Sequence, residues 1–140
     1  MLKEMLPVSI DTVVGETAKI KVDGYRFVTI SCTALDENTL EILYHFDKEL
    51  RLKHLRLTVS KDTAVPSISA VYLAAFLVEN EIQDLFGIHF EGLVIDYDRT
   101  LYLDEEVTVT PFCKYTATES PKEVNPPTPE SVAMSKSEEL

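Results

Sequence analysis

The feature that most constrains this chain is an apolar stripe at helical spacing that ends at a glycine. At 100° per residue, five apolar residues fall within about 40° of one line, and they are Val71, Ala75, Val78, Ile82 and Leu85. Gly87 follows, and glycine readily takes the left-handed conformation in which many helices end. The pattern predicts a helix that begins after Ser67 or Ser69, as the N-cap, and runs to about Phe86.

The far side of the same helix is apolar where a surface helix is usually polar. Leu73, Phe76 and Leu77 lie about 120° to 160° from the stripe. Asn80 and Asp84 continue that side in the next turns. A single sheet covers only one face of a helix, so a second apolar face needs another cover. The sequence leaves two alternatives for this cover: a partner chain or another segment of the same chain.

Three carboxylates on this helix raise the question of chemistry. Glu79 and Glu81 project roughly 160° apart, on opposite rims of the stripe, so they cannot serve one reacting atom. Glu81 and Asp84 lie about 60° apart, and with His89 beyond the helix they leave open a small acid–base enzyme or a carboxylate metal site. The sequence contains no glycine-rich phosphate loop, nucleophile elbow or zinc-ligand spacing. We therefore expect no catalysis by this chain alone.

Composition bounds the class of protein. The 140 residues, 45% of them hydrophobic and 26% charged, suit one globular domain. The longest apolar run, residues 70–78, is too short to span a bilayer, and the first residues lack the pattern of a secretory signal. Cys32 and Cys113 stand far apart and predict two free thiols. These observations predict a cytoplasmic protein.

The net charge of −11 is concentrated in one region. Residues 1–78 hold ten acids and nine bases, whereas residues 79–106 hold nine acids and one base, Arg99. Such a field repels nucleic acid and anionic lipid. It fits either a basic partner surface or a solvated face that aids solubility.

The rest of the chain is typical of a small sheet. Strands are predicted at 27–33, 40–46 and 50–59, and the alternation in the third slips by one place at His54, which suggests a bulge. Residues 8–28 fit either a helix over 10–22 or a hairpin across Asp23-Gly24. Residues 107–111 fit an edge strand or an arm. From residue 116 the proline-rich sequence predicts a tail that is extended or disordered when alone.

Several motifs together resemble those of a known family. They are Val65-Pro66-Ser67-Ile68, Glu79-Asn80-Glu81, Asp84-Leu85-Phe86-Gly87-Ile88 and Phe90-Glu91-Gly92. They are similar to the 30 kDa (C subunit) family of respiratory complex I and its hydrogenase relatives. That family has Pro-Ser, a helix with Glu-Arg-Glu, then Asp-(Met/Leu)-(Phe/Tyr)-Gly-Ile and Phe-x-Gly-His. The resemblance covers about residues 24 to 100.

The resemblance implies an α+β fold with a small mixed or antiparallel sheet and helices on one face. It selects the helix for residues 10–22. The implied organisation is a domain over residues 1–115, followed by the extended proline-rich tail over residues 116–140.

Two positions depart from the family pattern. Asn80 stands in place of the arginine, and Leu93 stands in place of the histidine. With the short chain, these departures look more like the D subunit of energy-converting (Ech-type) membrane-bound nickel–iron hydrogenases. The resemblance then implies an accessory subunit of a complex that couples ferredoxin-linked proton reduction to ion translocation. The alternative is the C subunit of an NADH or reduced coenzyme F420 dehydrogenase with a quinone-type acceptor.

The resemblance also implies partners. No cofactor is expected in this chain, and the NiFe centre and iron–sulfur clusters are expected in partner subunits. The expected partners are the large subunit and the small iron–sulfur subunit of the hydrogenase, with membrane subunits indirectly, at the inner face of the cell membrane. The predicted partner-binding residues are Leu73, Phe76, Leu77, Glu79, Asn80, Glu81, Asp84, Phe86 and Gly87.

Overall fold

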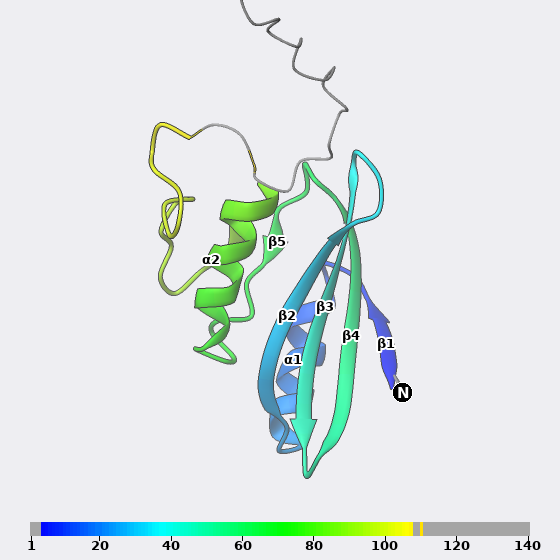
Figure 1. The fold of residues 1–140 in the computed structure, drawn as a ribbon. Helices are drawn as coiled ribbons and strands as arrows, with labels where there is room; N and C mark the ends of the chain where they lie inside the picture. The colour runs from blue at the N-terminus through cyan, green and yellow to red at the C-terminus, as the bar shows by residue number, and fades with distance from the viewer. Residues whose placement is uncertain (1–3, 108–109, 111–140) are drawn as a thin grey trace, which may run out of the picture.

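The computed structural model describes residues 4–107 and 110 of the chain (Figure 1). The elements, in chain order, are β1 (Met5–Val8), α1 (Val13–Val22), β2 (Arg26–Ala34), β3 (Thr39–Lys48), β4 (Arg51–Ser60), β5 (Val65–Pro66), α2 (Ala75–Phe86) and β6 (Phe90–Glu91). The predicted tail and Cys113 lie outside the described residues, as does most of the predicted segment 107–111. Neither α1 nor α2 has the length and apolar character that crossing a bilayer requires.

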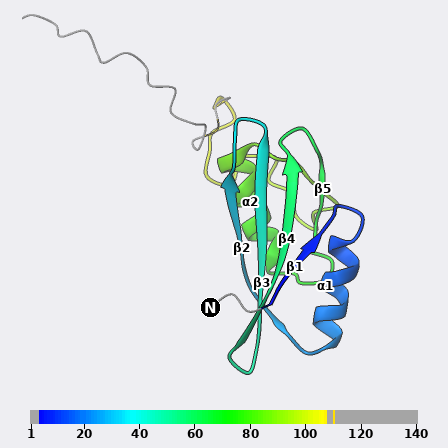
Figure 2. The ribbon, with the colours of Figure 1, turned by 90° about the vertical axis from the view of Figure 1, so that its right-hand side faces the viewer.

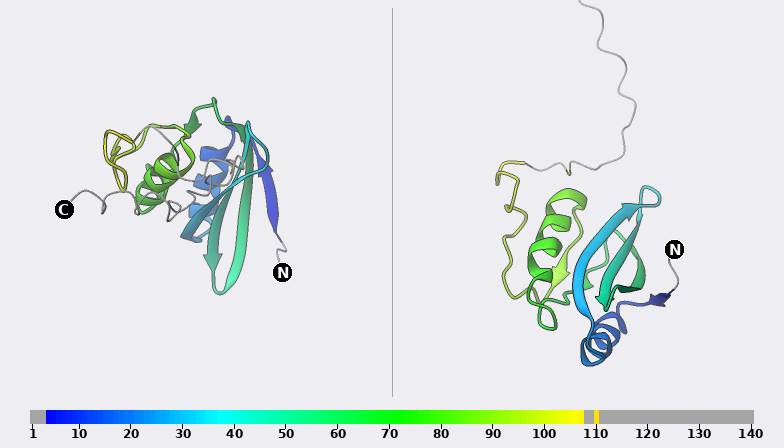
Figure 3. Two further views of the ribbon diagram at one scale, coloured as in Figure 1. Left: turned by 45° about the horizontal axis from the view of Figure 1, so that its top comes forward. Right: turned by 60° about the horizontal axis from the view of Figure 1, so that its bottom comes forward.

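Four strands form the main sheet, in the order β1-β4-β3-β2. β2, β3 and β4 pair antiparallel through two hairpins, whereas β1 pairs parallel with β4. The short strands β5 and β6 form a separate parallel pair. Both helices lie on one face of the main sheet, with α1 toward β1 and α2 toward β2 (Figures 2 and 3). The predicted α+β class, with a small mixed sheet and helices on one face, is confirmed.

The core lies between the sheet and the helices. Alternate residues of β3 and β4 point into it, because successive side chains of a strand point to opposite faces. These buried residues are Leu40, Ile42, Tyr44, Phe46, Leu55, Leu57 and Val59. The antiparallel register places Tyr44 opposite Leu55 and Ile42 opposite Leu57, so the two strands contribute matching rows. Val13 and Ile20 of α1 close one end of this core.

The bulge predicted at His54 is wrong, because β4 pairs with β3 in unbroken register from Arg51 to Ser60. The two residues that join these strands have positive φ angles, 51° at Glu49 and 65° at Leu50. Leu50 is therefore part of the hairpin turn and is 93% exposed. Leu52 points to the outer face of the sheet, so the apparent slip arose from counting two exposed leucines as core. An irregularity does occur in β2, between Phe27 and Thr29.

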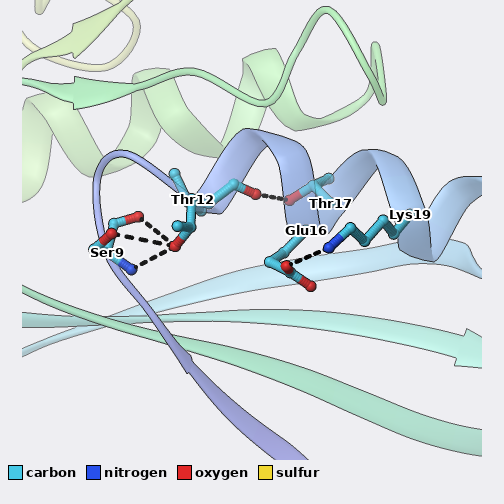
Figure 4. A network of polar contacts seen from close by, with 6 residues as sticks. Ser9, Thr12, Glu16, Thr17 and Lys19 are labelled. Atoms are coloured by element: carbon cyan, nitrogen blue, oxygen red, sulfur yellow. Dashed lines mark hydrogen bonds and ion pairs between the residues drawn. The ribbon is translucent and has the colours of Figure 1, made fainter.

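The helix predicted over residues 10–22 is confirmed as α1, although it begins at Val13. The alternative hairpin across Asp23-Gly24 is wrong, since Gly24 takes a φ of 87° just past the helix end. Figure 4 shows the polar contacts around α1. The Ser9 amide donates to Thr12 Oγ1 at 2.9 Å ahead of the first turn, and Lys19 pairs with Glu16 at 2.8 Å. These contacts fix the turn that leads from β1 into the helix.

The second helix begins later than the sequence predicts. α2 starts at Ala75, with Ala74 at the N-cap and no side-chain cap, so neither Ser67 nor Ser69 caps it. The serine hydroxyls are used elsewhere, on a carboxylate of the helix. The predicted helix end is confirmed, because Gly87 has a left-handed φ of 73° and its amide donates to the Gln83 carbonyl at 3.0 Å.

Substitutions on the two faces of β4 test which face belongs to the core. Leu55→Ala should lower the free energy of unfolding by about 2–5 kcal/mol, because it leaves a cavity in a fully buried site. The matched change Leu52→Ala, at a side chain that is 53% exposed on the same strand, should cost less than about 1 kcal/mol. Urea denaturation of both variants measures the difference. Equal losses would contradict the assignment of the two faces.

Candidate functional site

Four polar side chains of α2 are buried. Glu79, Asn80 and Asp84 are fully inaccessible to solvent, and Gln83 is nearly so. Buried polar groups require hydrogen-bond partners, and each of these side chains finds them in the backbone of a neighbouring segment. The candidate site is therefore built from α2 and from the segments that wrap around it.

Glu79 bonds the segment that precedes the helix. One carboxylate oxygen accepts the Ile68 amide at 2.8 Å, and the other accepts the Ser67 hydroxyl. Ser67 Oγ lies 2.7 Å from Ser69 Oγ, and Ser69 Oγ accepts the Val94 amide at 3.0 Å. The chain of contacts thus runs from the helix through both serines to the loop after β6.

Burial raises the pKa of Glu79 to about 7, and the bonds from Ser67 and Ile68 oppose that rise only in part. The phenol of Tyr44 on β3 lies in the same interior, where burial and the charge of Glu79 both raise its pKa. A carboxyl with such a pKa often signals catalysis. Here no exposed surface of Glu79 reaches a substrate, so the shift reflects a structural position.

Asn80 and Gln83 hold the loop that follows β6. The Asn80 amide group donates to the Ile95 carbonyl at 2.8 Å, and its oxygen accepts the Tyr97 amide at 2.9 Å. Gln83 donates to Asp96 at 3.1 Å and accepts the Phe90 amide at 2.9 Å. The short amide of Asn80 is thus matched to a loop that lies directly over the helix.

Asp84 ties the same loop further along. Its Oδ2 accepts the Tyr102 amide at 2.7 Å and the Leu103 amide at 3.3 Å. Its Oδ1 is buried and finds no hydrogen-bond partner in residues 4–107 and 110. These bonds and those of Asn80 show what covers one part of the far side of the helix. That part is covered by residues 95–103 of the same chain.

The structure therefore divides the predicted partner-binding residues into two groups. Glu79, Asn80 and Asp84 lie inside the chain, and their role toward a partner stays a prediction. Glu79 is also not a boundary residue of the stripe, because residues 67–69 cover it. Six predicted residues remain accessible: Leu73, Phe76, Leu77, Glu81, Phe86 and Gly87.

The outward side of the first turn of α2, together with the turn that precedes the helix, is apolar and open. Leu73 is 61% exposed and Leu77 is 46% exposed, while Phe76 between them is half-buried. No described segment covers the two leucines. They form the apolar part of the accessible surface, which we call the α2 outer face.

The positions of Asp84 and His89 bear on the acid–base and metal alternatives. Asp84 is committed to two backbone amides, while His89 is exposed beyond the helix end. Within the described residues, no three histidine, cysteine or acidic side chains are placed to hold a metal ion. The proposed set of Glu81, Asp84 and His89 therefore does not form a metal site in this structure.

The acidic loop that wraps α2 is hollowed on its surface. The hollow is lined by Asp96, Asp98, Asp104 and Glu105, around the single base Arg99. Asp98 and Arg99 have positive φ angles of 51° and 64°, which turn the loop sharply at this point. The acidity predicted for residues 79–106 is therefore divided, with two acids of α2 buried and the loop acids facing solvent.

Sequence reasoning missed three members of the buried network: Ser67, Ser69 and Gln83. The serines match the pattern of an N-cap, because a hydroxyl ahead of a helix usually bonds its first turn. Gln83 gives no signal, since a lone glutamine on a helix is ordinarily solvated. A second missed group is Ser31, His45 and His54 on the outer face of the sheet, joined at 2.8 Å and 2.7 Å.

The buried carboxyl gives a pH prediction. Glu79 has a pKa of about 7 in the folded chain and about 4.3 when unfolded. The folded state therefore binds more protons between these values, and its contribution to stability falls as pH rises toward 7 and levels off above it. The slope is at most about 1.4 kcal/mol per pH unit.

Denaturation of Glu79→Gln at several pH values measures this contribution. The variant should lack that part of the slope between pH 5 and 7, whereas Glu81→Gln, on the same helix but half-buried, should keep it. Identical pH profiles for the native chain and Glu79→Gln would contradict the burial of this group.

Comparison with known proteins adds to the geometry. Residues 9–122 match the family described as the respiratory-chain NADH dehydrogenase 30 Kd subunit. The C subunit of the NADH-quinone oxidoreductase of Ruegeria pomeroyi is 38% identical over 74 residues, which cover 48% of this chain and 37% of that protein. The corresponding subunit of Phenylobacterium zucineum is 36% identical over 59 residues, which cover 40% and 28%. The match therefore spans about a third of the length of these curated relatives.

A solved structure has a similar fold. It is a chain of the membrane-bound sulfane sulfur reductase, an archaeal respiratory membrane complex. The TM-score is 0.54 at 21% sequence identity, over 70% of this chain and 66% of that one. At this identity the likeness concerns the fold.

Proposed function

This chain belongs to the family of the respiratory-chain NADH dehydrogenase 30 kDa subunit, and from that membership we propose that it is a cofactor-free scaffold subunit of a membrane-bound respiratory complex. Its role is to dock on the large catalytic subunit in the peripheral arm. The α2 outer face provides the apolar centre of that contact. The observation that carries the proposal is that Leu73, in the turn before α2, and Leu77 of α2 stay exposed although neighbouring residues are covered.

The contacts of α2 support a scaffold rather than a catalyst. Its buried polar groups accept or donate to backbone groups of the wrapping segments, so they are not free to act on a substrate. The fold also occurs in a sulfane sulfur reductase complex, while the curated relatives are subunits of NADH-quinone oxidoreductases. A scaffold subunit shared by complexes that catalyse different reactions accounts for both similarities.

The acidic loop supplies the charged rim of the proposed interface. Asp96, Asp98, Asp104 and Glu105 face solvent around one hollow. A basic partner surface complements them and speeds the encounter, because attraction between opposite charges steers association. The apolar α2 outer face then provides the buried centre, in the usual arrangement of an apolar core within a polar rim.

Within this family we propose the energy-converting hydrogenase as the parent complex. Asn80 and Leu93 stand in place of the family's arginine and histidine, and this replacement supports the choice. Asn80 bonds the loop of this chain, and Leu93 packs against its core. The NiFe centre and iron–sulfur clusters then belong to partner subunits. The second candidate is the C subunit of an NADH or reduced coenzyme F420 dehydrogenase, and the curated relatives favour it.

Introducing charge into the apolar face tests the docking role. In a complex purified through a tag on the large subunit, Leu73→Asp combined with Leu77→Asp should reduce the recovered chain at least tenfold, because two buried carboxylates lack partners. Leu50→Asp, at the 93% exposed hairpin turn, is the matched control and should be recovered like the native chain. Recovery of the double variant at the native level, with an unchanged denaturation midpoint, would rule out docking through this face.

The complex that co-purifies with the tagged native chain distinguishes the two candidates. The hydrogenase proposal predicts bound nickel and hydrogen evolution from reduced ferredoxin. A complex without nickel that oxidises NADH or reduced coenzyme F420 would favour the dehydrogenase. Both measurements use the native assembly, so neither depends on the behaviour of a variant.

A further inference from the structure

Three lysines from distant parts of the chain gather around two tyrosines beside the start of α2. The ammonium of Lys21, in the last turn of α1, lies 5.4 Å from the ring centroid of Tyr72. The ammonium groups of Lys48 on β3 and Lys53 on β4 lie 5.8 Å and 5.3 Å from the ring centroid of Tyr25. The Tyr72 hydroxyl donates to the Tyr25 carbonyl at 2.7 Å and so joins the two halves. We call these five residues the tyrosine–lysine cluster.

The tyrosine–lysine cluster rests on a rigid base and adjoins the α2 outer face. The Tyr72 ring packs against Phe46, with 5.5 Å between the ring centroids, and against Phe27, with 6.0 Å. Phe46 is fully buried, so this side of the cluster belongs to the core. Tyr72 directly precedes Leu73, the first residue of the α2 outer face. A partner that covers Leu73 therefore comes within reach of the lysines.

The three lysines are held in place, but their charges are not neutralised. Lys21 donates to the Val71 carbonyl and Lys48 to the Asp23 carbonyl, and both acceptors are uncharged. No ion pair joins any of the three lysines to a carboxylate of residues 4–107 and 110. Because the chain has 24 acidic and only 13 basic side chains, this lack of pairing is unexpected. The entropy cost of fixing lysines and the repulsion of gathered like charges are thus borne by the free chain, which favours an anionic group from another molecule.

The cluster gives the α2 outer face a rim with two charged ends. The cluster contacts the turn before the helix, whereas Asn80 and Asp84, which hold the acidic loop, follow Leu77 along the helix. In Figure 1 the acidic loop, drawn in yellow, lies well away from the β3–β4 turn, beside which the cluster stands. The rim is therefore basic beside the start of the helix and acidic beyond Leu77. A partner with the complementary order of charges fits in one orientation, and the reversed orientation brings like charges together at both ends.

We propose that the tyrosine–lysine cluster is a second docking surface, which binds carboxylates of the large catalytic subunit and fixes the orientation of docking. The proposal rests on the proposed function and adds the chemistry of the partner. That partner carries acids opposite the cluster, apolar side chains opposite Leu73 and Leu77, and bases opposite the acidic loop. Phosphate groups of lipid or nucleic acid fit less well, because the acidic loop and the net charge of −11 repel a densely anionic surface.

Charge reversal at Lys53 tests the proposal in the complex purified through a tag on the large subunit. The Lys53 ammonium lies over the Tyr25 ring and forms no ion pair within the described residues, so its replacement should leave the denaturation midpoint nearly unchanged. Lys53→Glu should lower recovery of the chain at least about fivefold at ~0.1 M salt, because repulsion replaces attraction. The loss should shrink at ~0.5 M salt, which screens exposed charges. Lys53→Arg keeps the charge and should be recovered like the native chain.

Lys61→Glu is the matched control. Both lysines are half-buried, and the register of β3 with β4 places Lys53 near one end of the sheet and Lys61 just beyond the other. Recovery of Lys61→Glu should equal that of the native chain at both salt concentrations. Carbodiimide, which couples an amine to a carboxylate in direct contact, gives a second readout on the native complex. It should link Lys48 or Lys53 to an aspartate or glutamate of the large subunit.

Native-level recovery of Lys53→Glu at low salt, or an absence of coupling between these lysines and the large subunit, would overturn the proposal. Binding of the full chain to phosphatidylserine vesicles that is lost in Lys53→Glu would also overturn it and assign the cluster to a lipid surface. Failure of the cluster is distinguishable from failure of the proposed function. If Leu73→Asp with Leu77→Asp still lowers recovery, docking through the α2 outer face stands without the cluster.

Discussion

The fold depends on hydrogen bonds between α2 and backbone that has no regular partner of its own. Residues 67–69 and 93–103 belong to no strand, and several of their backbone groups bond side chains of α2 instead. An unpaired buried backbone group costs about 1–3 kcal/mol. Polar side chains from successive turns of α2 supply these hydrogen bonds, and they are Glu79, Asn80, Gln83 and Asp84. The helix is thus an internal frame on which the irregular half of the molecule is assembled.

This constraint explains why α2 carries acids inside the molecule. A carboxylate accepts several amide bonds at once, and bonds to a charged acceptor are stronger than those between neutral groups. Burial makes that choice costly at Glu79, which accounts for its raised pKa. Asp84 places the same kind of acceptor near the other end of the helix, where it holds the acidic loop. Around α2, within the described residues, the surface open to the proposed partner is the apolar α2 outer face and the outward acids of that loop.

The regular half of the fold was predictable from the sequence, because local pattern and tertiary environment agree there. The sequence predicted the strand at residues 40–46 that lies within β3, and Gly87 indicated the end of α2 through its backbone freedom alone. Leu50 and Leu52 misled the prediction, since a leucine in a turn or on the outer face looks the same in sequence as one in the core.

The candidate site was less predictable. A helical projection gives the direction of Glu79 and Asn80 but contains no information on which distant segment lies in that direction. It therefore places both at the boundary or against a partner. Ser67 and Ser69 fit a cap for the same reason: the contact with Glu79 spans more than ten residues of sequence. Long-range cover of this kind is decided by the whole fold.

The central claim is that α2 uses its polar side chains inside the molecule, while Leu73 and Leu77 face a partner. A photoreactive amino acid placed at position 73, and in a control at the similarly exposed Leu52 on the outer face of the sheet, tests this claim in the native complex. The account predicts a cross-link from position 73 to the large catalytic subunit and none to that subunit from position 52. A cross-link to the large subunit from position 52, with none from position 73, would contradict it.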